Sequence, residues 1–403
     1  MLFRSCIVAG FVSGLLIGFN GFMWSQAVIV EVYVLSVLSL AGVLACLLRW
    51  TYAPHQYRYL YLAFFWFGIC FNNHQSLLVI AMGMEVAIVA VRPALGRELF
   101  FWNVICWLGG LVGLQAGMIN VLQDNSPLLN FYNAVGISSL LAWIYLAFTT
   151  KMRMISLARN LTLVGSIGYA AVLFGHITNY VTAFDYKQGL FVLFNMVGLA
   201  CIAACVYLVL ITTESQTVPG KLPNPFKKLW LKSLAAKEWV AALLCGLGWT
   251  IGAAFYVYMP LASMSNPPLN WGYPRTVQGF FHAFTRGQYE RIHPTTSLGS
   301  YWDQIGMYIG GAIDEFNLIF LLLAFVPFLF YKRMQKREKA WLIGLTAIYL
   351  CLSFVLLILL NPGADRQSRD LNRVFFTASH VMLSMLIGYG LTLIAATDRK
   401  SVV

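Results

Sequence analysis

The sequence predicts an all-α protein, a polytopic bundle of about twelve transmembrane helices. Of its 403 residues, 60% are hydrophobic and only 10% are charged. The apolar runs are long enough to cross a bilayer as helices, which takes roughly 20 residues each. They are also too long and too continuous for the strands of a membrane barrel, which alternate over about ten residues. Because backbone groups in lipid must be paired internally, we expect residues 1–403 to form a single helical transmembrane domain.

Twelve apolar stretches follow one another along the chain. We expect spans at residues 6–22, 24–48, 57–72, 75–92, 99–121, 134–150, 160–178, 188–212, 238–259, 316–331, 340–360 and 374–396. The third and fourth spans are short and form a tight hairpin that turns at residues 72–75. The first span follows Arg4 as in a signal peptide, but no small-residue cleavage site follows it, so we interpret it as a retained helix.

The placement of lysine and arginine predicts the orientation of the bundle. Twenty of the 27 basic residues lie at the termini or in connections that alternate correctly through twelve spans to share one side. Basic residues concentrate on the cytoplasmic side, so both termini are predicted to be cytoplasmic. The net charge of +12 is then explained by orientation and by anionic lipid, without a nucleic-acid partner. The seven basic residues predicted outside are Lys187, Arg275, Arg286, Arg291, Arg366, Arg369 and Arg373.

Six of these seven residues fall in two outer connections, residues 260–315 and 361–373. The second belongs to the segment NPGADRQSRDLNRVFF, in which five of the nine residues from Asp365 to Arg373 are charged. Arginines on this side oppose the orientation rule, which favours a functional role over that of a solvated loop. A helical stretch would place Arg366, Arg369 and Arg373 at positions i, i+3 and i+7, facing one ligand.

The guanidinium group binds phosphate through two parallel hydrogen bonds, so these arginines, together with Arg286, predict a site for a lipid-linked phosphate at the membrane surface. Asp370 lies four residues after Arg366 and is expected to brace it. Asp365 and Asp370 are expected either to hold the arginines or to orient an acceptor.

The long connection 260–315 contains an amphipathic segment. Val277, Phe280, Phe281 and Phe284 recur with helical spacing, which predicts an interfacial helix on the outer leaflet. The alternative is a helix packed on top of the bundle. Three further candidate site residues follow it: Arg286, Gln288 and Tyr289.

Two ionisable residues near the predicted outer surface are also candidates. Glu31 shares a helical face with Trp24, about 10 Å below that surface, and an ionisable group at such depth suggests function, although a structural hydrogen bond would also explain it. His74 lies at the outer hairpin turn, where a capping or packing role is favoured over catalysis. Asp314 and Glu315 lie at the start of a predicted span, where the helix dipole favours acidic side chains, though either could act as a base. No clustered metal ligands or nucleotide-binding motifs appear.

Four segments together resemble a known family. They are Trp24-Ser25-Gln26 with Glu31-Val32-Tyr33, then Asn73-His74, then NPPLNWGYP running on to TRGQY, and finally NPGADRQSRDLNRVFF. The chain resembles a bacterial membrane family of the domain-of-unknown-function type, related to the transmembrane O-mannosyltransferase that acts on IPT domains. The ordered set covers most of the chain. It adds Gln26, Asn73, His74, Asn270 and Trp271 to the candidate substrate-binding residues.

This resemblance implies a glycosyltransferase of the GT-C superfamily in the bacterial inner membrane, with its active face in the periplasm. Such enzymes transfer a sugar from a polyprenyl-phosphate donor to a protein or glycan acceptor. A carboxylate activates the acceptor hydroxyl and arginine steadies the departing phosphate, so neither a metal nor a further cofactor is implied.

One part of the family pattern is missing. The family carries its catalytic carboxylate in an Asp-Ser-Gly-Glu-like stretch one helix upstream of Trp24, and this sequence has none. We expect that the chain begins after that loop. The catalytic residue is therefore not assigned, and Glu31, the first acidic residue, is the candidate.

Two other classes of protein remain open. Twelve spans would suit a transporter or a lipid-linked sugar flippase, and a noncatalytic scaffold is the third reading. Transporters tend to have internal repeats and polar sites at the membrane midplane. Here the unusual polar residues gather at the outer surface, which favours glycosyl transfer.

Overall fold

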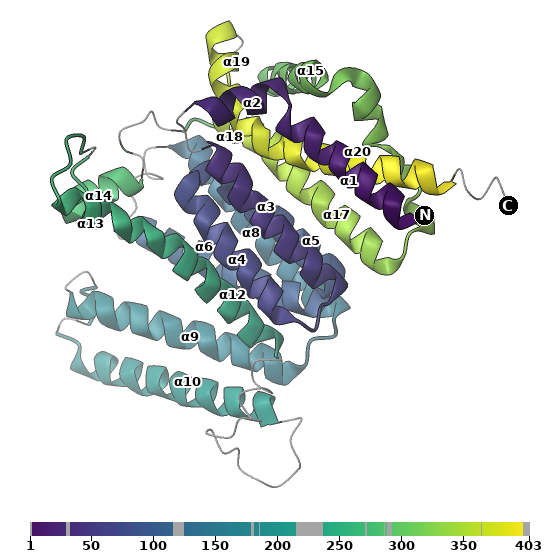
Figure 1. The fold of residues 1–403 in the computed structure, drawn as a ribbon. Coiled ribbons are helices and arrows are strands. Elements are labelled where there is room, and N and C mark those ends of the chain that lie inside the picture. Colours follow the sequence, from purple (N-terminus) through teal and green to yellow (C-terminus); the bar gives the residue numbers. More distant parts are fainter. Residues whose placement is uncertain are drawn as a thin grey trace. The chain divides into compact units, whose positions relative to one another are not determined.

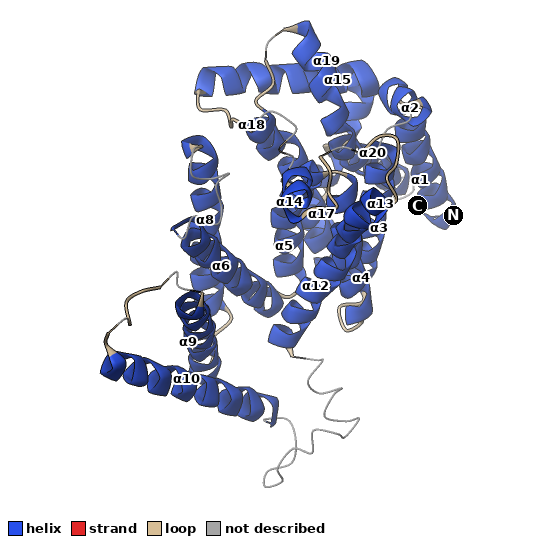
Figure 2. Cartoon of the chain, turned by 90° about the vertical axis from the view of Figure 1, so that its left-hand side faces the viewer, coloured by secondary structure: helices blue, strands red, loops and turns tan. Residues whose placement is uncertain are grey.

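The computed structural model describes residues 2–29, 33–115, 125–178, 181–184, 186–214, 237–270, 272–285, 287, 292–363 and 365–397. These residues form helices joined by short connections, and none of them is in a β-strand (Figure 1, Figure 2). The helices group into two compact units. Unit 1 comprises Met1–Arg92 and Leu243–Val403, and unit 2 comprises Pro93–Ala242. The apolar pattern alone gave no sign of such a division.

Unit 1 begins with α1 (Leu2–Gly18) and the short α2 (Gly21–Val28). Its next helices are α3 (Tyr33–Tyr52), α4 (Tyr57–Asn73), the 3-10 helix η1 (Gln75–Val79) and α5 (Ile80–Val91). The later part contains η2 (Ala254–Val257), α13 (Tyr258–Met264), α14 (Val277–Phe284), α15 (Leu298–Leu323), α16 (Val326–Leu329) and η3 (Tyr331–Arg333). It ends with α17 (Lys336–Leu350), the π-helix η4 (Cys351–Val355), α18 (Leu356–Leu360), α19 (Arg366–Arg373), η5 (Val374–Phe376) and α20 (Thr377–Thr397).

Unit 2 contains α6 (Pro93–Gln115), α8 (Ser126–Thr149), α9 (Met154–Ile177) and α10 (Gln188–Glu214). The helix α12 (Glu238–Ala253) begins in unit 2 and continues into unit 1. A buried ion pair joins α6 to α9, because Arg159 Nη2 lies 3.1 Å from Glu98 Oε2 and both side chains are almost fully buried. Arg97 approaches the other oxygen of Glu98 at 2.7 Å. The charges are therefore paired where α6 and α9 meet.

Nine helices of the described residues are long and apolar enough to cross a membrane, or ten if the bent pair α1–α2 counts as one span. This agrees with an all-α, polytopic membrane bundle. The expected number was twelve. Of the two short spans of the predicted hairpin, α4 has only 17 residues and Gln75–Val91 is likewise shorter than an ordinary span. The hairpin between them turns at His74, as the sequence predicts.

Small residues allow close packing between the helices of unit 1. A Cβ atom on Gly68 of α4 would lie 2.3 Å from the backbone oxygen of Trp249 in α12. A Cβ atom on Gly83 of α5 would lie 2.6 Å from the Cα atom of Ile348 in α17. Glycine at these positions therefore lets the backbones approach more closely than any side chain would permit.

The helix ends predicted to be on the outer side meet at one end of unit 1. Asn73 Nδ2 at the end of α4 donates to the backbone oxygen of Leu35 near the start of α3, at 3.1 Å. The ring of His74 lies 5.0 Å from that of Phe375, just before α20. Figure 1 shows α2, α15 and α19 gathered at this same end. The alternating direction of the helices in unit 1 is therefore as expected, whereas which side of a membrane this end faces stays a prediction.

The amphipathic segment forms a helix, α14, as its spacing predicts, whereas its place at the membrane interface stays a prediction. Thr276 caps it by accepting a hydrogen bond from the backbone N–H of Gly279, at 3.0 Å. Its last residue, Phe284, is held at unit 1 because Gln75 Nε2 donates to its backbone oxygen at 2.8 Å. Val277 and Phe281 remain 73% and 57% exposed. One side of α14 thus packs on the bundle, while these two apolar side chains face outward and could meet lipid.

The predicted connection 260–315 contains more helix than the sequence suggested. The helix α13 extends to Met264, and α15 begins at Leu298, well before the expected span at 316–331. Within α15, Asn317 has φ 63° and ψ 147° and breaks the helix into two parts. The first part therefore runs in a different direction from the second, and it forms one wall of the cavity described next.

Candidate functional site

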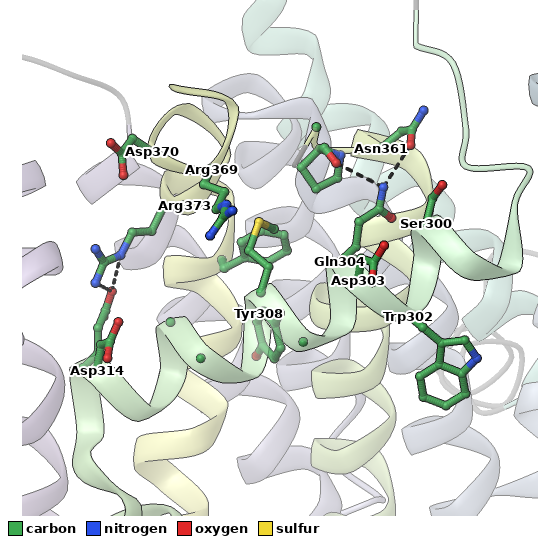
Figure 3. Close-up of a pocket in the computed structure, with 18 of the residues that line it drawn as sticks. Ser300, Trp302, Asp303, Gln304, Tyr308, Asp314, Asn361, Arg369, Asp370 and Arg373 are labelled. Atoms are coloured by element: carbon green, nitrogen blue, oxygen red, sulfur yellow. Dashed lines mark hydrogen bonds and ion pairs between the residues drawn. The ribbon is translucent and has the colours of Figure 1, made fainter. Parts of the chain in front are cut away.

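A cavity of about 950 Å³ lies at the predicted outer end of unit 1. Its walls are one face of the first part of α15, the turn at residues 361–363, α19, and the first turns leading into α20 (Figure 3). The ionisable residues that line it are Asp303, Asp314, Glu315, Arg369, Asp370, Arg373 and His380. This charged lining stands out in a chain with so few charges.

The face of α15 that lines the cavity has the period of an α-helix. Ser300, Gln304, Tyr308, Gly311 and Glu315 follow one another at intervals of three or four residues, so they lie along one side. At a rise of 1.5 Å per residue, this row is about 22 Å long. The cavity therefore extends along the helix and has two ends with different chemistry.

No other residue in the described part of the chain forms a hydrogen bond or ion pair with two aspartates on this face. Asp303 and Asp314 are eleven residues apart, which is about three turns, so they share the face roughly 16 Å from one another. Both side chains are exposed, and both line the cavity. Figure 3 shows Asp303 near Gln304, and Asp314 near Arg373 of α19. Each aspartate is thus available to a ligand at a different end of the cavity.

The break at Asn317 changes the setting of Asp314 and Glu315. The sequence placed them at the start of a membrane span, where the helix dipole favours acidic groups. In the structure they lie instead near the C-terminal end of the first part of α15, where the dipole disfavours them. The explanation by a helix start is therefore wrong, and Arg373 from α19 pairs with the charge of Glu315.

An ion pair closes the arginine end of the cavity. Arg373 Nη2 lies 2.8 Å from Glu315 Oε1, and Arg373 Nε donates to the same oxygen at 2.9 Å. The guanidinium also lies over the ring of Phe22 in α2, 4.8 Å from the ring centre. On the other side of the carboxylate, His380 Nδ1 lies 3.2 Å from Oε2. One edge of the Arg373 guanidinium is therefore occupied by Glu315.

A neutral hydrogen-bond network fixes the opposite end. Gln304 Nε2 donates to Asn361 Oδ1 at 2.9 Å and to the backbone oxygen of Pro362 at 3.1 Å. The Thr295 hydroxyl donates to the Gln304 side-chain oxygen at 3.0 Å. These bonds attach the 361–363 turn to α15, so these two walls of the cavity are held against each other.

The charged segment forms a helix, as its spacing predicts. Asp365 caps α19 by accepting a hydrogen bond from the backbone N–H of Ser368 at 2.8 Å. Arg369 and Arg373 line the cavity, whereas Arg366 does not. Arg366 lies two turns before Arg373, about 10 Å further along the helix, and its side chain is 97% exposed. The structure thus brings two of the three arginines to one cavity.

The two aspartates of this segment differ in their roles. Asp370 lines the cavity and lies 3.9 Å from Arg366, which is the expected bracing pair. Because both side chains of this pair are well exposed, it contributes little to stability. Asp365 does not line the cavity and acts as the helix cap.

Other predicted site residues lie outside the cavity lining. Asn73 donates to Ser39 at 3.1 Å, and the His74 ring nitrogen Nδ1 lies 2.6 Å from the Ser76 hydroxyl and caps η1. Gln26 is buried in α2. Asn270 accepts a hydrogen bond from the Ser263 hydroxyl at 2.8 Å. For His74, the geometry is that of the capping histidine favoured above.

Five predicted site residues lie outside the described part of the chain: Glu31, Trp271, Arg286, Gln288 and Tyr289. Within the described part, no group of three His, Cys, Asp or Glu side chains is placed to hold a metal ion.

The sequence did not single out Asp303, Gln304 or His380. The polar and small residues that recur at intervals of three or four from Ser300 to Glu315 would have predicted an amphipathic helix with a polar face. That signal was lost because residues 298–315 were read as part of an outer loop.

The fold and the cavity define a polytopic helical membrane protein with a charged, ligand-sized site at one end of the bundle. Residues 3–95, less than a quarter of the chain, match the family described as Protein O-mannosyl-transferase TMEM260 N-terminal domain. This stretch supports a relation to O-mannosyltransferases. It also supplies Phe22, which packs against Arg373 at the site. No curated protein and no solved structure matches the chain.

Proposed function

We propose that the protein is a membrane glycosyltransferase, similar to protein O-mannosyltransferases, that transfers a sugar from a polyprenyl-phosphate donor to an acceptor hydroxyl. The observation that carries this proposal is the cavity that Arg369, Arg373, Asp303 and Asp314 line together, in a chain whose residues 3–95 match an O-mannosyltransferase domain.

The two ends of the cavity suit the two parts of such a reaction. Guanidinium groups bind phosphate oxygens, so Arg369 with the remaining edge of Arg373 would hold the donor's phosphate. Asp303, Gln304 and Asn361 offer acceptors and donors for the hydroxyl groups of a sugar or an acceptor. The lining has more carboxylates than arginines, so it suits a singly linked phosphate better than a more highly charged ligand.

The transfer needs a base and a stabilised leaving group. The acceptor oxygen would form a bond to the anomeric carbon as the bond from that carbon to the phosphate oxygen breaks. A carboxylate would take the acceptor's proton, and arginine would stabilise the charge left on the phosphate. Asp314 lies on the arginine side of the cavity and is our candidate base from the described residues, beside the earlier candidate Glu31. The sugar is activated by the phosphate, so no further cofactor is needed.

The proposed setting is a bacterial inner membrane with both termini in the cytoplasm. The cavity would then face the periplasm at headgroup depth, where a lipid-linked sugar and a protein or glycan acceptor can both reach it.

Donor binding and transfer by the purified full chain in detergent test this proposal. The protein should bind dodecyl mannosyl phosphate, and Arg369→Ala should weaken that binding about tenfold or more, because a charge-assisted bond is lost. Arg333→Ala is the matched control, since Arg333 lies in η3 and does not line the cavity. Sugar transfer to a threonine-containing peptide should fall in Asp314→Asn. Equal binding and transfer by all three variants would contradict the proposal.

A further inference from the structure

The negative charge of Asp303 is not needed for the reaction proposed above. Asp303 lines the cavity with an exposed side chain, and among the described residues none forms a hydrogen bond or ion pair with it. It is the sixth residue of α15, so it lies beyond the first helical turn, where the helix dipole favours acidic side chains. Neither a structural partner nor the start of the helix therefore explains this charge.

The end of the cavity around Asp303 offers no positive charge to neutralise it. Gln304 and Asn361, which lie at this end, are uncharged and are bonded to each other (Figure 3). The two arginines that line the cavity both belong to α19, where the donor's phosphate is proposed to bind. Over the whole lining, four carboxylates accompany these two guanidinium groups, and a bound phosphate would increase the negative excess. A cationic ligand is therefore favoured at the Asp303 end.

The wall of the cavity between Asp303 and Asp314 is bare helix backbone. Gly306 and Gly310 line the cavity between the two aspartates, at intervals of three or four residues, so all four lie on one face of α15. A Cβ atom on either glycine would meet no neighbouring heavy atom within 4 Å, so no packed neighbour requires glycine here. Glycine also destabilises a helix relative to alanine. The face therefore leaves room for a ligand to lie close against the helix between the two carboxylates.

The separation of the two aspartates fits an extended peptide. They are roughly 16 Å apart along α15, and an extended chain advances about 3.3 Å per residue. A serine or threonine placed at Asp314, on the arginine side of the cavity, therefore brings a residue about five positions away to Asp303. A neutral oligosaccharide could span the same distance, but it would leave the Asp303 carboxylate without a counter-charge.

We propose that Asp303 is a specificity-determining residue that selects an extended acceptor polypeptide carrying a lysine or arginine about five residues from the modified hydroxyl. The proposal rests on the proposed function for the place of that hydroxyl, which Asp314 and the arginines of α19 define. The basic side chain pairs with the Asp303 carboxylate, while the peptide between them lies along Gly306 and Gly310.

Peptide binding to the purified full chain in detergent tests this inference. The probes are short peptides with blocked ends, built of glycine and alanine around one threonine. One set carries a lysine about five positions from the threonine, in either chain direction, and a matched set has glutamine in its place. Calorimetry at low salt should show that lysine is preferred about fivefold in one direction, as for an ion pair that water reaches. The preference should shrink as salt is added.

Variants assign the preference to one carboxylate. Asp303→Asn should reduce it to within about twofold, and Asp303→Lys should reverse it, so that a peptide with glutamate in place of the lysine binds best. A merely structural role would not produce that reversal. Asp365→Ser removes an acidic side chain outside the cavity lining, keeps an oxygen for the cap of α19 and should retain the preference. Asp370→Asn, which removes another lining carboxylate, should retain it as well.

The outcomes separate this inference from the proposed function. If dodecyl mannosyl phosphate binds and its sugar reaches the lysine and glutamine peptides equally, the inference is overturned while the proposed function stands. If the lysine preference is present and reverses in Asp303→Lys, but the donor neither binds nor reacts, the inference holds and the donor assignment fails. A preference that Asp303→Asn leaves unchanged or that Asp370→Asn abolishes overturns the inference. Binding of mannotriose but of no peptide, or of no probe at all, overturns it too.

Discussion

Arg373 and Glu315 form an ion pair of 2.8 Å between α19 and α15, with the carboxylate almost fully buried and the guanidinium 37% exposed. The pair joins two segments that the sequence separates by more than fifty residues and that together enclose the cavity. It also gives the arginine-rich segment a structural role beside the ligand-binding role proposed for it.

Removing Arg373 should destabilise the protein. Arg373→Ala leaves the Glu315 carboxylate buried without its arginine, and we expect a loss of about 1–3 kcal/mol, lowered from the range for a fully buried pair because Arg373 is partly in solvent. Thermal unfolding in detergent measures this. The double variant Arg373→Met, Glu315→Leu should recover most of the loss, since it leaves no unpaired charge. A double variant as unstable as the sum of its single changes would show that the two residues do not act as a pair.

The orientation of the bundle predicts which positions react from outside. Single cysteines at Ser297 and Gln367, in a background without the native cysteines, should react with an impermeant maleimide in intact spheroplasts. A cysteine at Lys336, at the start of α17, should react only after lysis, because positively charged connections stay in the cytoplasm. The reverse pattern would overturn the proposed orientation of the cavity.

The arginines of α19 should differ in their effect on donor binding. Arg369 lines the cavity, so Arg369→Lys should weaken binding of dodecyl mannosyl phosphate by losing the planar two-bond contact, and Arg369→Ala should weaken it further. Arg366 is 97% exposed, and Arg366→Ala should change the affinity by less than about twofold. Calorimetry on folded variants measures both. Equal losses at the two positions would mean that the ligand extends along the whole of α19.

The helix break at Asn317 should depend on the side chain at that position. Its φ of 63° is unfavourable for a β-branched residue, so Asn317→Val should cost about 1 kcal/mol or more. Asn317→Gly relieves the backbone but loses the hydrogen bond that Oδ1 accepts from the N–H of Ile319 at 3.3 Å, so we expect a small change of either sign. Thermal unfolding distinguishes the two. A valine variant as stable as the wild type would indicate that α15 can straighten at no cost.

The hydrogen bonds at the neutral end of the cavity should also contribute to the stability of the fold. Gln304 is 5% exposed and donates to Asn361 and to the backbone of Pro362. Gln304→Leu leaves the Pro362 oxygen without this donor, while Asn361 Oδ1 still has the Thr295 hydroxyl at 3.0 Å, and the change should cost about 1–3 kcal/mol in thermal unfolding. Gln304→Glu should cost more at neutral pH, because a carboxylate would face two oxygens. Gln367→Leu, on the exposed part of α19, is the control and should be nearly neutral.

Much of the helical fold is readable in the sequence. The apolar runs predicted α4, α10 and α20 to within about three residues, since a membrane span must be apolar and internally hydrogen-bonded. The span expected at 24–48 was wrong at its start, because α2 and α3 are separate helices and α3 begins at Tyr33. The spacing of Phe280, Phe281 and Phe284 predicted α14. The alternating basic connections predicted which helix ends lie together in unit 1.

The first part of α15 was missed because its amphipathic pattern is not that of a span. A helix that lines a polar cavity on one side has polar residues every three or four positions, and this breaks up the apolar run that identifies a membrane helix. Residues 298–315 therefore looked like a loop, and Asp303 and Gln304 went unnoticed. For the same reason, Asp314 and Glu315 were expected at the start of a helix. A single asparagine, Asn317, does not by itself predict that a helix breaks at that position.

The sequence by itself determined the all-α membrane class and most of the helices, and it singled out the charged segment at 361–373, because hydropathy, charge placement and helical spacing are local properties. Only the tertiary structure decided that Arg373 pairs with Glu315, that Arg366 points away from the cavity, and that His380 lies beside the same carboxylate. These contacts join residues that lie tens to hundreds of positions apart. Their partners are selected by how the helices pack, and no local pattern in the chain records that.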